Sequence, residues 1–341
     1  MFQIADYKID IDGVLRDVPK RTKDVVSRRF GIRKKKNETN KETLESIGKD
    51  YGITRERIRQ IEKKGIETLR RSPKFSQLEG ALLKIKYFID ENGGLKREDI
   101  LGSNLAPEEQ YRSYLLLLLE LGDMFSYMYD TPIFYSFWKT QEEAEKIAQK
   151  INGLFVDILK KERKLFPENE IVELGKQEAQ KEFKKNFKEN YILSYIEVSK
   201  IIEKNPFGEY GLSSWPEVSP KGVKTKAYLV LKKEGRPVHF QELSEMIEEK
   251  LNSPVHVNTL HNELIKDPSF VLVGRGIYGL KEWGYTQGTV KEIIEGVLKQ
   301  EGELSKEEII QKVQDQRFVK DSTIILNLGD FNKTKEGKYT I

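Results

Sequence analysis

The residues best suited to recognise another molecule are polar side chains clustered between positions 55 and 63. Arginine can bond O6 and N7 of guanine bidentately, glutamine can bond N6 and N7 of adenine in the same way, and glutamate can accept from N4 of cytosine. With the spacing of an α-helix, one side of this stretch is polar and carries Arg55, Glu56, Arg59, Gln60 and Lys63. The other side is apolar and carries Ile58, Ile61, Gly65 and Leu69. Such a helix could read base edges, although an ordinary solvated helix has the same mixture of charges.

The elements that must present this helix are predicted by the residues around it. Positions 43–69 read as two short helices joined by a tight turn at 51–53, where Gly52 can adopt the positive φ that the turn needs. Thr54 can cap the second helix by accepting a backbone N–H. A first helix across the phosphates and a second helix in the major groove form the arrangement that a helix-turn-helix reader requires.

Residues 20–71 resemble region 4 of the bacterial sigma-70 family. The resemblance rests on RTKDVVSRRFGI followed by TLESIGKDYGITRERIRQIEKKGIETLRR, in which TRERIRQIE is the most specific part. It implies binding to the −35 promoter element and docking on the β flap of RNA polymerase. The base contacts that it implies come from Arg55, Glu56, Arg59 and Gln60. The further DNA-binding residues that it implies are Thr43, Thr54, Arg57 and Lys63. The loop 34–40 is more basic than the family pattern and could add phosphate contacts.

Charge and composition place this basic footprint in a chain of several small modules. The net charge of the 341 residues is +4, but positions 19–71 carry roughly ten net positive charges, which leaves about −6 for the rest. An apolar fraction of 38% is low for one large core. We therefore expect a local nucleic-acid contact and several small domains.

The chain lacks the residues that several classes of protein need. The chain has no cysteine, which excludes disulfides and thiolate metal sites and suits a reducing cytosol. His256 and His261 lie five apart, which does not put both on one helical face, so no metal site is expected. No catalytic set is recognisable, and we expect neither an enzyme nor a cofactor. No signal peptide is recognisable, and the longest apolar run, 114–119, is too short for a bilayer, so we expect a cytoplasmic, nucleoid-associated protein.

The rest of the chain predicts a mainly α fold, in which the helix-turn-helix is followed by tandem winged-helix units with small β-hairpin wings. In 75–139 the expected helices are 77–91, 96–101 and 108–122, and an aromatic hairpin that covers a small core follows. The same order recurs in 222–285, with helices at 228–233, 240–251 and 257–265, and in 286–341, with helices at 290–300, 306–313 and 322–328. Residues 140–219 are a possible further unit, since their EYGLSSW matches IYGLKEW.

The remaining segments are a helix-turn-helix at 19–72 and a lead-in at 1–18, with joints near Ser72, Thr140, 219–222 and 286–288. The lead-in contains Asp10-Ile11-Asp12-Gly13, which resembles the nucleophile motif of haloacid dehalogenase-type phosphatases. That chemistry needs a large α/β domain after the motif. A helical region follows instead, so we do not expect a phosphatase.

Residues 223–285 resemble the HARE-type helix-turn-helix domain, which includes the N-terminal domain of the delta subunit of bacterial RNA polymerase. The phrases that carry this resemblance are AYLVLKKEGRPVHFQEL, VNTLHNELIKDPSFVLVGRGIYGL and KEWGY. It implies a winged helix that associates with DNA or with a transcription complex. Gly274-Arg275-Gly276 reads as the turn of the wing, where Arg275 could meet a phosphate or the minor groove. The acidic tail of the delta subunit has no counterpart here, so its nucleic-acid-displacing behaviour is not expected.

Together these features predict a DNA-binding bacterial transcription factor that reads a −35-like element in double-stranded DNA and associates with core RNA polymerase. About twenty residues precede the sigma-like segment, so a complete sigma factor is not expected. One alternative is an interaction protein that competes with sigma for the polymerase without reading DNA. The other is the DNA-recognition subunit of a restriction or modification system, because HARE-like domains resemble modules fused to such enzymes.

Overall fold

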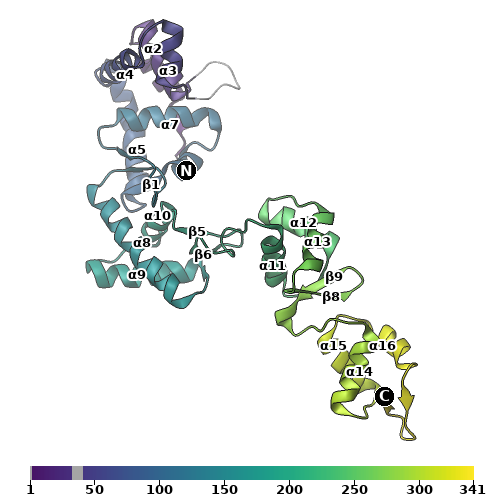
Figure 1. Ribbon diagram of the computed structural model, residues 1–341. Coiled ribbons are helices and arrows are strands. Elements are labelled where there is room, and N and C mark those ends of the chain that lie inside the picture. Colours follow the sequence, from purple (N-terminus) through teal and green to yellow (C-terminus); the bar gives the residue numbers. More distant parts are fainter. Residues whose placement is uncertain (1, 33–40) are drawn as a thin grey trace. The chain divides into compact units, whose positions relative to one another are not determined.

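The computed structural model describes residues 2–32 and 41–341, and its helices are accompanied by small antiparallel sheets (Figure 1). The chain divides into two compact units, 1–203 with 210–212, and 204–209 with 213–341. The mainly α character expected from the sequence is confirmed. The basic loop 34–40 lies outside the described residues.

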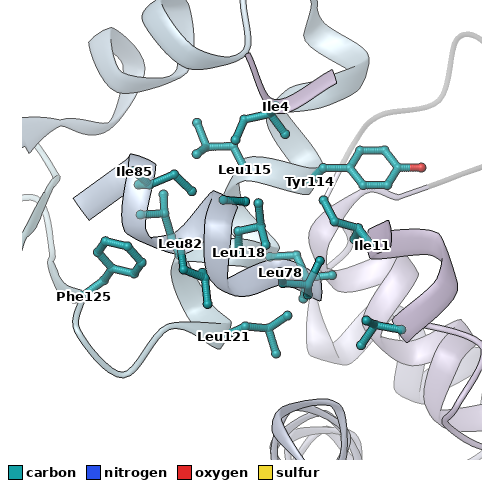
Figure 2. Packing of buried hydrophobic residues seen from close by; sticks show 14 of the residues in the cluster. Ile4, Ile11, Leu78, Leu82, Ile85, Tyr114, Leu115, Leu118, Leu121 and Phe125 are labelled. Atoms are coloured by element: carbon teal, nitrogen blue, oxygen red, sulfur yellow. The ribbon is translucent and has the colours of Figure 1, made fainter. Parts of the chain in front are cut away.

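The N-terminal segment is part of the first unit's main core. The elements up to position 70 are η1 (Ile4–Tyr7), α1 (Lys8–Val14), α2 (Lys20–Phe30), α3 (Leu44–Tyr51) and α4 (Arg55–Arg70). Ile4 and Ile11 are completely buried, in one cluster with apolar residues from the segment 78–121 (Figure 2). A seven-residue helix is not stable alone in water, so α1 depends on burying its apolar face. The core therefore runs across the expected joint at Ser72, and Asp12 accepts a hydrogen bond of 3.2 Å from the hydroxyl of Tyr114.

A three-stranded sheet completes the next part of the unit. Its elements are η2 (Pro73–Leu78), α5 (Glu79–Asp90), β1 (Leu95–Arg97), α6 (Glu98–Leu105), α7 (Glu109–Leu121), β2 (Ser126–Met128) and β3 (Phe137–Lys139). The strand order is β1-β3-β2, all antiparallel. Phe125, Phe137 and Trp138 are buried, so these aromatic residues cover a core as expected.

The start predicted for the helix at 96–101 is wrong, because its first two residues lie in a strand. Lys96 lies in β1, opposite Trp138, and the helix begins at Glu98. The side chain of Lys96 is only 7% exposed, and its ammonium donates to Glu197 at 2.7 Å and to Ser194 at 3.1 Å. Strand pairing and these distant acceptors outweigh the local helical pattern.

The last part of the first unit repeats the same arrangement. Its elements are α8 (Glu142–Glu162), β4 (Phe166–Pro167), α9 (Glu168–Phe183), α10 (Glu189–Glu197), β5 (Ile202–Lys204) and β6 (Glu209–Leu212), with strand order β4-β6-β5. Helix α10 packs against β1, and the Tyr195 hydroxyl donates to the carbonyl of Gly93 at 2.9 Å. Residues 142–203 therefore share one packed body with the preceding sheet.

The second unit carries two further helical segments. The first contains α11 (Val223–Glu234), β7 (Val238–His239), α12 (Phe240–Leu251), α13 (Val257–Lys266), β8 (Phe270–Gly274), β9 (Ile277–Leu280) and η3 (Lys281–Trp283), with strand order β7-β9-β8. The second contains α14 (Val290–Glu301), α15 (Lys306–Gln316), α16 (Asp321–Leu328), β10 (Asn332–Lys333) and β11 (Tyr339–Thr340). The expected helices are present, and α12 has the expected bounds.

One order of elements recurs along the chain. In 79–139, 142–212 and 223–280, a helix, a strand, two helices and two strands follow one another, and the last strand lies in the middle of the sheet. In the C-terminal segment a bridge between Leu304 and Tyr339 replaces the first strand. This is the order expected for the repeat. Its assignment to the winged-helix class, and the division into six domains, stay predictions.

Candidate nucleic-acid interface

A small core holds the three helices of the sigma-like segment together. Val25 of α2, Ile47 of α3 and Ile58 of α4 are completely buried against one another. Gly52 has φ 62°, in the left-handed region, and ends α3 as expected. At Gly65 a Cβ atom would lie 2.7 Å from Cγ2 of Thr22, so α2 and α4 cross too closely for a side chain there.

Two threonines define where the helices of the turn begin. The hydroxyl of Thr43 accepts a hydrogen bond of 3.1 Å from the backbone N–H of Ser46, at the start of α3. The hydroxyl of Thr54 accepts one of 3.2 Å from the backbone N–H of Arg57, at the start of α4. The cap predicted at Thr54 is confirmed. Both hydroxyls are exposed and still carry a proton to donate, which is what a phosphate oxygen requires.

The two sides of α4 differ as the helical spacing predicts. Ile58, Gly65 and Leu69 are buried, and Ile61 is half-buried. The side chains that are exposed to solvent include Arg55, Glu56, Arg57, Arg59, Gln60 and Lys63. The structure therefore brings the predicted base-reading residues together on one exposed surface, at the N-terminal half of one helix.

These exposed residues bond to one another. The Nε and Nη2 atoms of Arg59 donate to the two carboxylate oxygens of Glu56 at 2.9 and 2.7 Å. One residue further along the helix, Nη1 of Arg57 donates to Oε1 of Gln60 at 3.0 Å. Both pairs have i, i+3 spacing, which places side chains side by side on a helix.

The pairing shifts the titration of both charged partners. The hydrogen bonds that Arg59 donates hold the pKa of Glu56 below its usual value. The same bonds raise the pKa of Arg59. Because the folded-state pKa of Glu56 is lowered, the contribution of the pair to stability is present above the ordinary glutamate pKa. It is lost as the pH falls through the lowered value.

We therefore expect Arg59→Ala to raise the pKa of Glu56 towards that of a free glutamate. The carboxyl chemical shift of Glu56, followed by NMR during an acid titration, measures this directly. A Glu56 titration curve that does not move in the variant would contradict the pairing.

Two other arginines of the segment, Arg28 and Arg29, are structural. Their residue type does not distinguish them in the sequence from the arginines expected to contact bases. The Arg28 side chain is 15% exposed, and it bonds Glu42 at 2.6 Å and also Asp50. Arg29 bonds Glu62 at 3.2 Å. These pairs tie α2 to the start and end of α3 and to α4. Arg28 has Asp24 at i−4, with 3.8 Å between Nη1 and Oδ2, but the carboxylates that bond Arg28 and Arg29 more closely lie 14 to 33 positions away, where no periodic signal indicates them.

Arg275 occupies the expected place in the second unit. It lies in the turn between β8 and β9, next to Gly276 at φ 70°, and its side chain is exposed. Among residues 2–32 and 41–341, no group of three or more His, Asp or Glu residues is placed to hold a metal ion. Within the same residues, no helix has both the length and the apolar composition to cross a bilayer.

The packed helices, the glycine turn and the exposed polar helix define the class: residues 20–70 form a helix-turn-helix module. Comparison with known proteins then identifies its kind. Residues 14–71 match the family described as Sigma-70, region 4. The resemblance expected for 20–71 is confirmed, and a sigma-70 region 4 domain is found in this chain.

Relatives of this segment are RNA polymerase sigma factors. RpoD of Helicobacter pylori is 40% identical over 80 residues, which are 24% of this chain and 11% of that protein. SigA1 of Synechococcus elongatus is 43% identical over 61 residues, which are 18% of this chain and 14% of that protein. SigA of a Bacillus species is 37% identical over 75 residues, which are 22% of this chain and 19% of that protein. The chain thus spans between a tenth and a fifth of the length of these relatives. The HARE-type resemblance of 223–285 stays a prediction.

Proposed function

We propose that this chain is a non-catalytic transcription regulator, which binds promoter DNA through α4 and associates with RNA polymerase. The observation that carries the proposal is the exposed polar half of α4, inside a segment that matches sigma-70 region 4. A helix presented in this way can enter the major groove with its N-terminal residues against base edges. The DNA element proposed is −35-like, because the residue types at 55, 56, 59 and 60 are those of the TRERIRQIE motif.

In this proposal the contacts on DNA divide into two kinds. Base discrimination comes from Arg55, Glu56, Arg59 and Gln60. Phosphate contacts come from Arg57, Lys63 and the two capping threonines. Phosphate contacts position the helix, and only base contacts select a sequence. Polymerase association, with the β flap as the docking site, follows from the sigma-like segment as a whole. The exposed Arg275 adds a phosphate or minor-groove contact from a winged-helix unit of HARE type.

Selection of bound DNA from a random pool, with and without core RNA polymerase, tests the proposal. A −35-like element should be enriched by the full chain. The logarithm of the binding constant should fall with the logarithm of the salt concentration, with a slope of about −0.9 for each phosphate neutralised. Lys63→Ala should make this slope shallower by about one while the base preference is unchanged. Polymerase binding without any enriched sequence would contradict DNA reading and support competition with sigma.

A further inference from the structure

The repeated segments differ in what surrounds their third helix. In 79–139 that helix is α7, which packs against α2 and α4 and buries more than half of its residues. In 142–212 it is α10, which packs against β1 of the preceding segment. In 223–280 it is α13, which packs against α11, α12 and β8 of its own segment and buries Leu260 and Leu264. One side of α13 is therefore open to solvent, whereas α7 and α10 are covered by neighbouring elements.

We propose that this open side of α13, together with the turn at Arg275, is a second DNA-reading surface, which selects an element rich in A·T pairs. The exposed residues of the open side are Asn258, Thr259, Asn262, Ile265 and Lys266. The inference rests on the proposed function in one respect, namely that the chain binds duplex DNA. It goes further, because that function assigns base discrimination to α4.

The open side of α13 carries side chains that suit an A·T pair. Asn258 and Asn262 lie one turn apart, and each amide can bond N6 and N7 of adenine bidentately. Ile265 follows three residues later and is 62% exposed, and an apolar side chain at such a place can contact the C5 methyl of thymine. Spacings of four and three put these side chains on one side of a helix. The combination favours adenine on one strand and thymine on the other.

These polar side chains have no partner inside the protein. Within residues 2–32 and 41–341, no hydrogen bond or ion pair holds Asn258, Thr259, Asn262, Lys266 or Arg275. Other asparagines of the chain are used by the fold. Asn152 donates to the carbonyls of Ala148 and Tyr195, and Asn205 accepts from two backbone N–H groups of its turn. The amides on α13 therefore remain available to a ligand.

Aromatic rings hold the turn that carries Arg275 close to α13. The ring of His239 lies on Phe240 with 4.7 Å between centroids, and Phe240 stacks on His261 of α13 at 4.3 Å. Gly276 lies against the other end of this stack, since a Cβ there would be 2.6 Å from Nε2 of His239. Arg275 and Lys266 can then contact phosphates near the base pairs that the amides read.

Charge alone would bind this unit to DNA only weakly. Over 213–341, basic and acidic residues are equal in number. Glu263 on α13 is half-buried, and α12 exposes several glutamates, including Glu245 and Glu248. These carboxylates oppose phosphates, so the surface needs its amide contacts to bind. Binding through α4 also raises the effective concentration of α13 at nearby DNA, so the second element should be detected with the full chain.

Two exposed residues on neighbouring helices of the same unit provide matched controls. Gln311→Ala removes an exposed amide from α15, where it bonds Asp315 at 3.0 Å. Ile325→Ala removes an isoleucine that is 41% exposed on α16, as a match for Ile265→Ala. Both variants should leave the choice of DNA unchanged.

Selection of duplex DNA from a long random pool by the full chain tests the inference. The parent chain should enrich two elements, one −35-like and one rich in A·T pairs. We expect Asn262→Ala to lower the preference for one adenine of the second element by roughly fivefold to a hundredfold, with the −35-like element unchanged. Lys266→Ala should make the salt dependence shallower by about one phosphate without a change of preference. Circular dichroism first establishes equal helix content.

The outcomes separate this inference from the proposed function. Enrichment of the −35-like element alone overturns the inference and leaves the proposed function standing, as does a second element that persists when Asn258 and Asn262 are both replaced by alanine. Enrichment of the second element alone supports the inference and contradicts reading by α4. If the double variant instead loses binding to core RNA polymerase with every DNA preference intact, α13 is a protein-binding surface and the inference is wrong.

Discussion

Replacing Ile11 with alanine is expected to lower the free energy of unfolding of the first unit by about 2–5 kcal/mol. Ile11 is completely buried in a cluster that also contains Leu78 of η2 and Leu118 of α7 (Figure 2). Leu69 of α4 belongs to the same cluster. Removing three methyl or methylene groups from a close-packed core loses their transfer free energy and leaves a cavity. Chemical denaturation of the full chain, followed by circular dichroism, measures the change.

Amide hydrogen exchange of the same variant shows whether the N-terminal segment and the helix-turn-helix unfold together. Because Ile11 and Leu69 share one core cluster, Ile11→Ala should reduce amide-exchange protection in α4 as well as in α1. Gly13→Ala is the control, since a Cβ at Gly13 in α1 meets nothing within 4 Å and alanine favours a helix by about 0.5–1 kcal/mol. Equal stability of Ile11→Ala and the parent chain would show that residues 1–18 are a dispensable lead-in.

Replacing Arg59 or Gln60 with alanine is expected to cost about 1–3 kcal/mol of specific DNA affinity each, with relaxed base choice at one position. Both side chains are exposed at the N-terminal half of α4, and each can make a bidentate contact to a purine. Neither is part of the core, so the free energy of unfolding should change little. Equilibrium binding to the selected element and to a scrambled duplex measures the specific part.

Matched controls separate base reading from a general change of surface charge. Lys176→Ala removes a half-buried cation that is paired with a glutamate at i−3, as Arg59 is, and Gln177→Ala removes an exposed glutamine. Neither lies in the helix-turn-helix, so both should leave the specific affinity unchanged. Loss of affinity for both duplexes in equal measure with Arg59→Ala would indicate a phosphate contact instead.

The reading helix and its turn were predictable because their signals are local. A glycine at 52, a capping threonine at 54 and the spacing of Ile58 and Leu69 determine where α3 ends, where α4 begins and which side is buried. Which polar side chains of α4 are exposed follows from the same spacing. Each of these features depends on residues within one or two helical turns, and a helix has a fixed period.

Features that depend on distant partners were not predictable in this way. Lys96 reads as helical by its neighbours but lies in a strand, since its partners Trp138 and Glu197 come from later in the chain. The N-terminal 18 residues read as a lead-in because nothing local indicates that Ile4 and Ile11 are buried in a core to which η2 and α7 contribute.

By itself, then, the amino-acid sequence determined the helices, the turn and the exposed polar face of α4, through periodicity and capping. Only the tertiary structure decided which arginines remain available to a ligand. Arg28 and Arg29 are held by carboxylates of α3 and α4, from Asp50 and Glu62, whereas Arg59 is paired only with its helical neighbour Glu56 among the contacts found in the described residues. An ion pair forms where folding brings two groups within about 4 Å, and that distance depends on how the helices pack rather than on residue type.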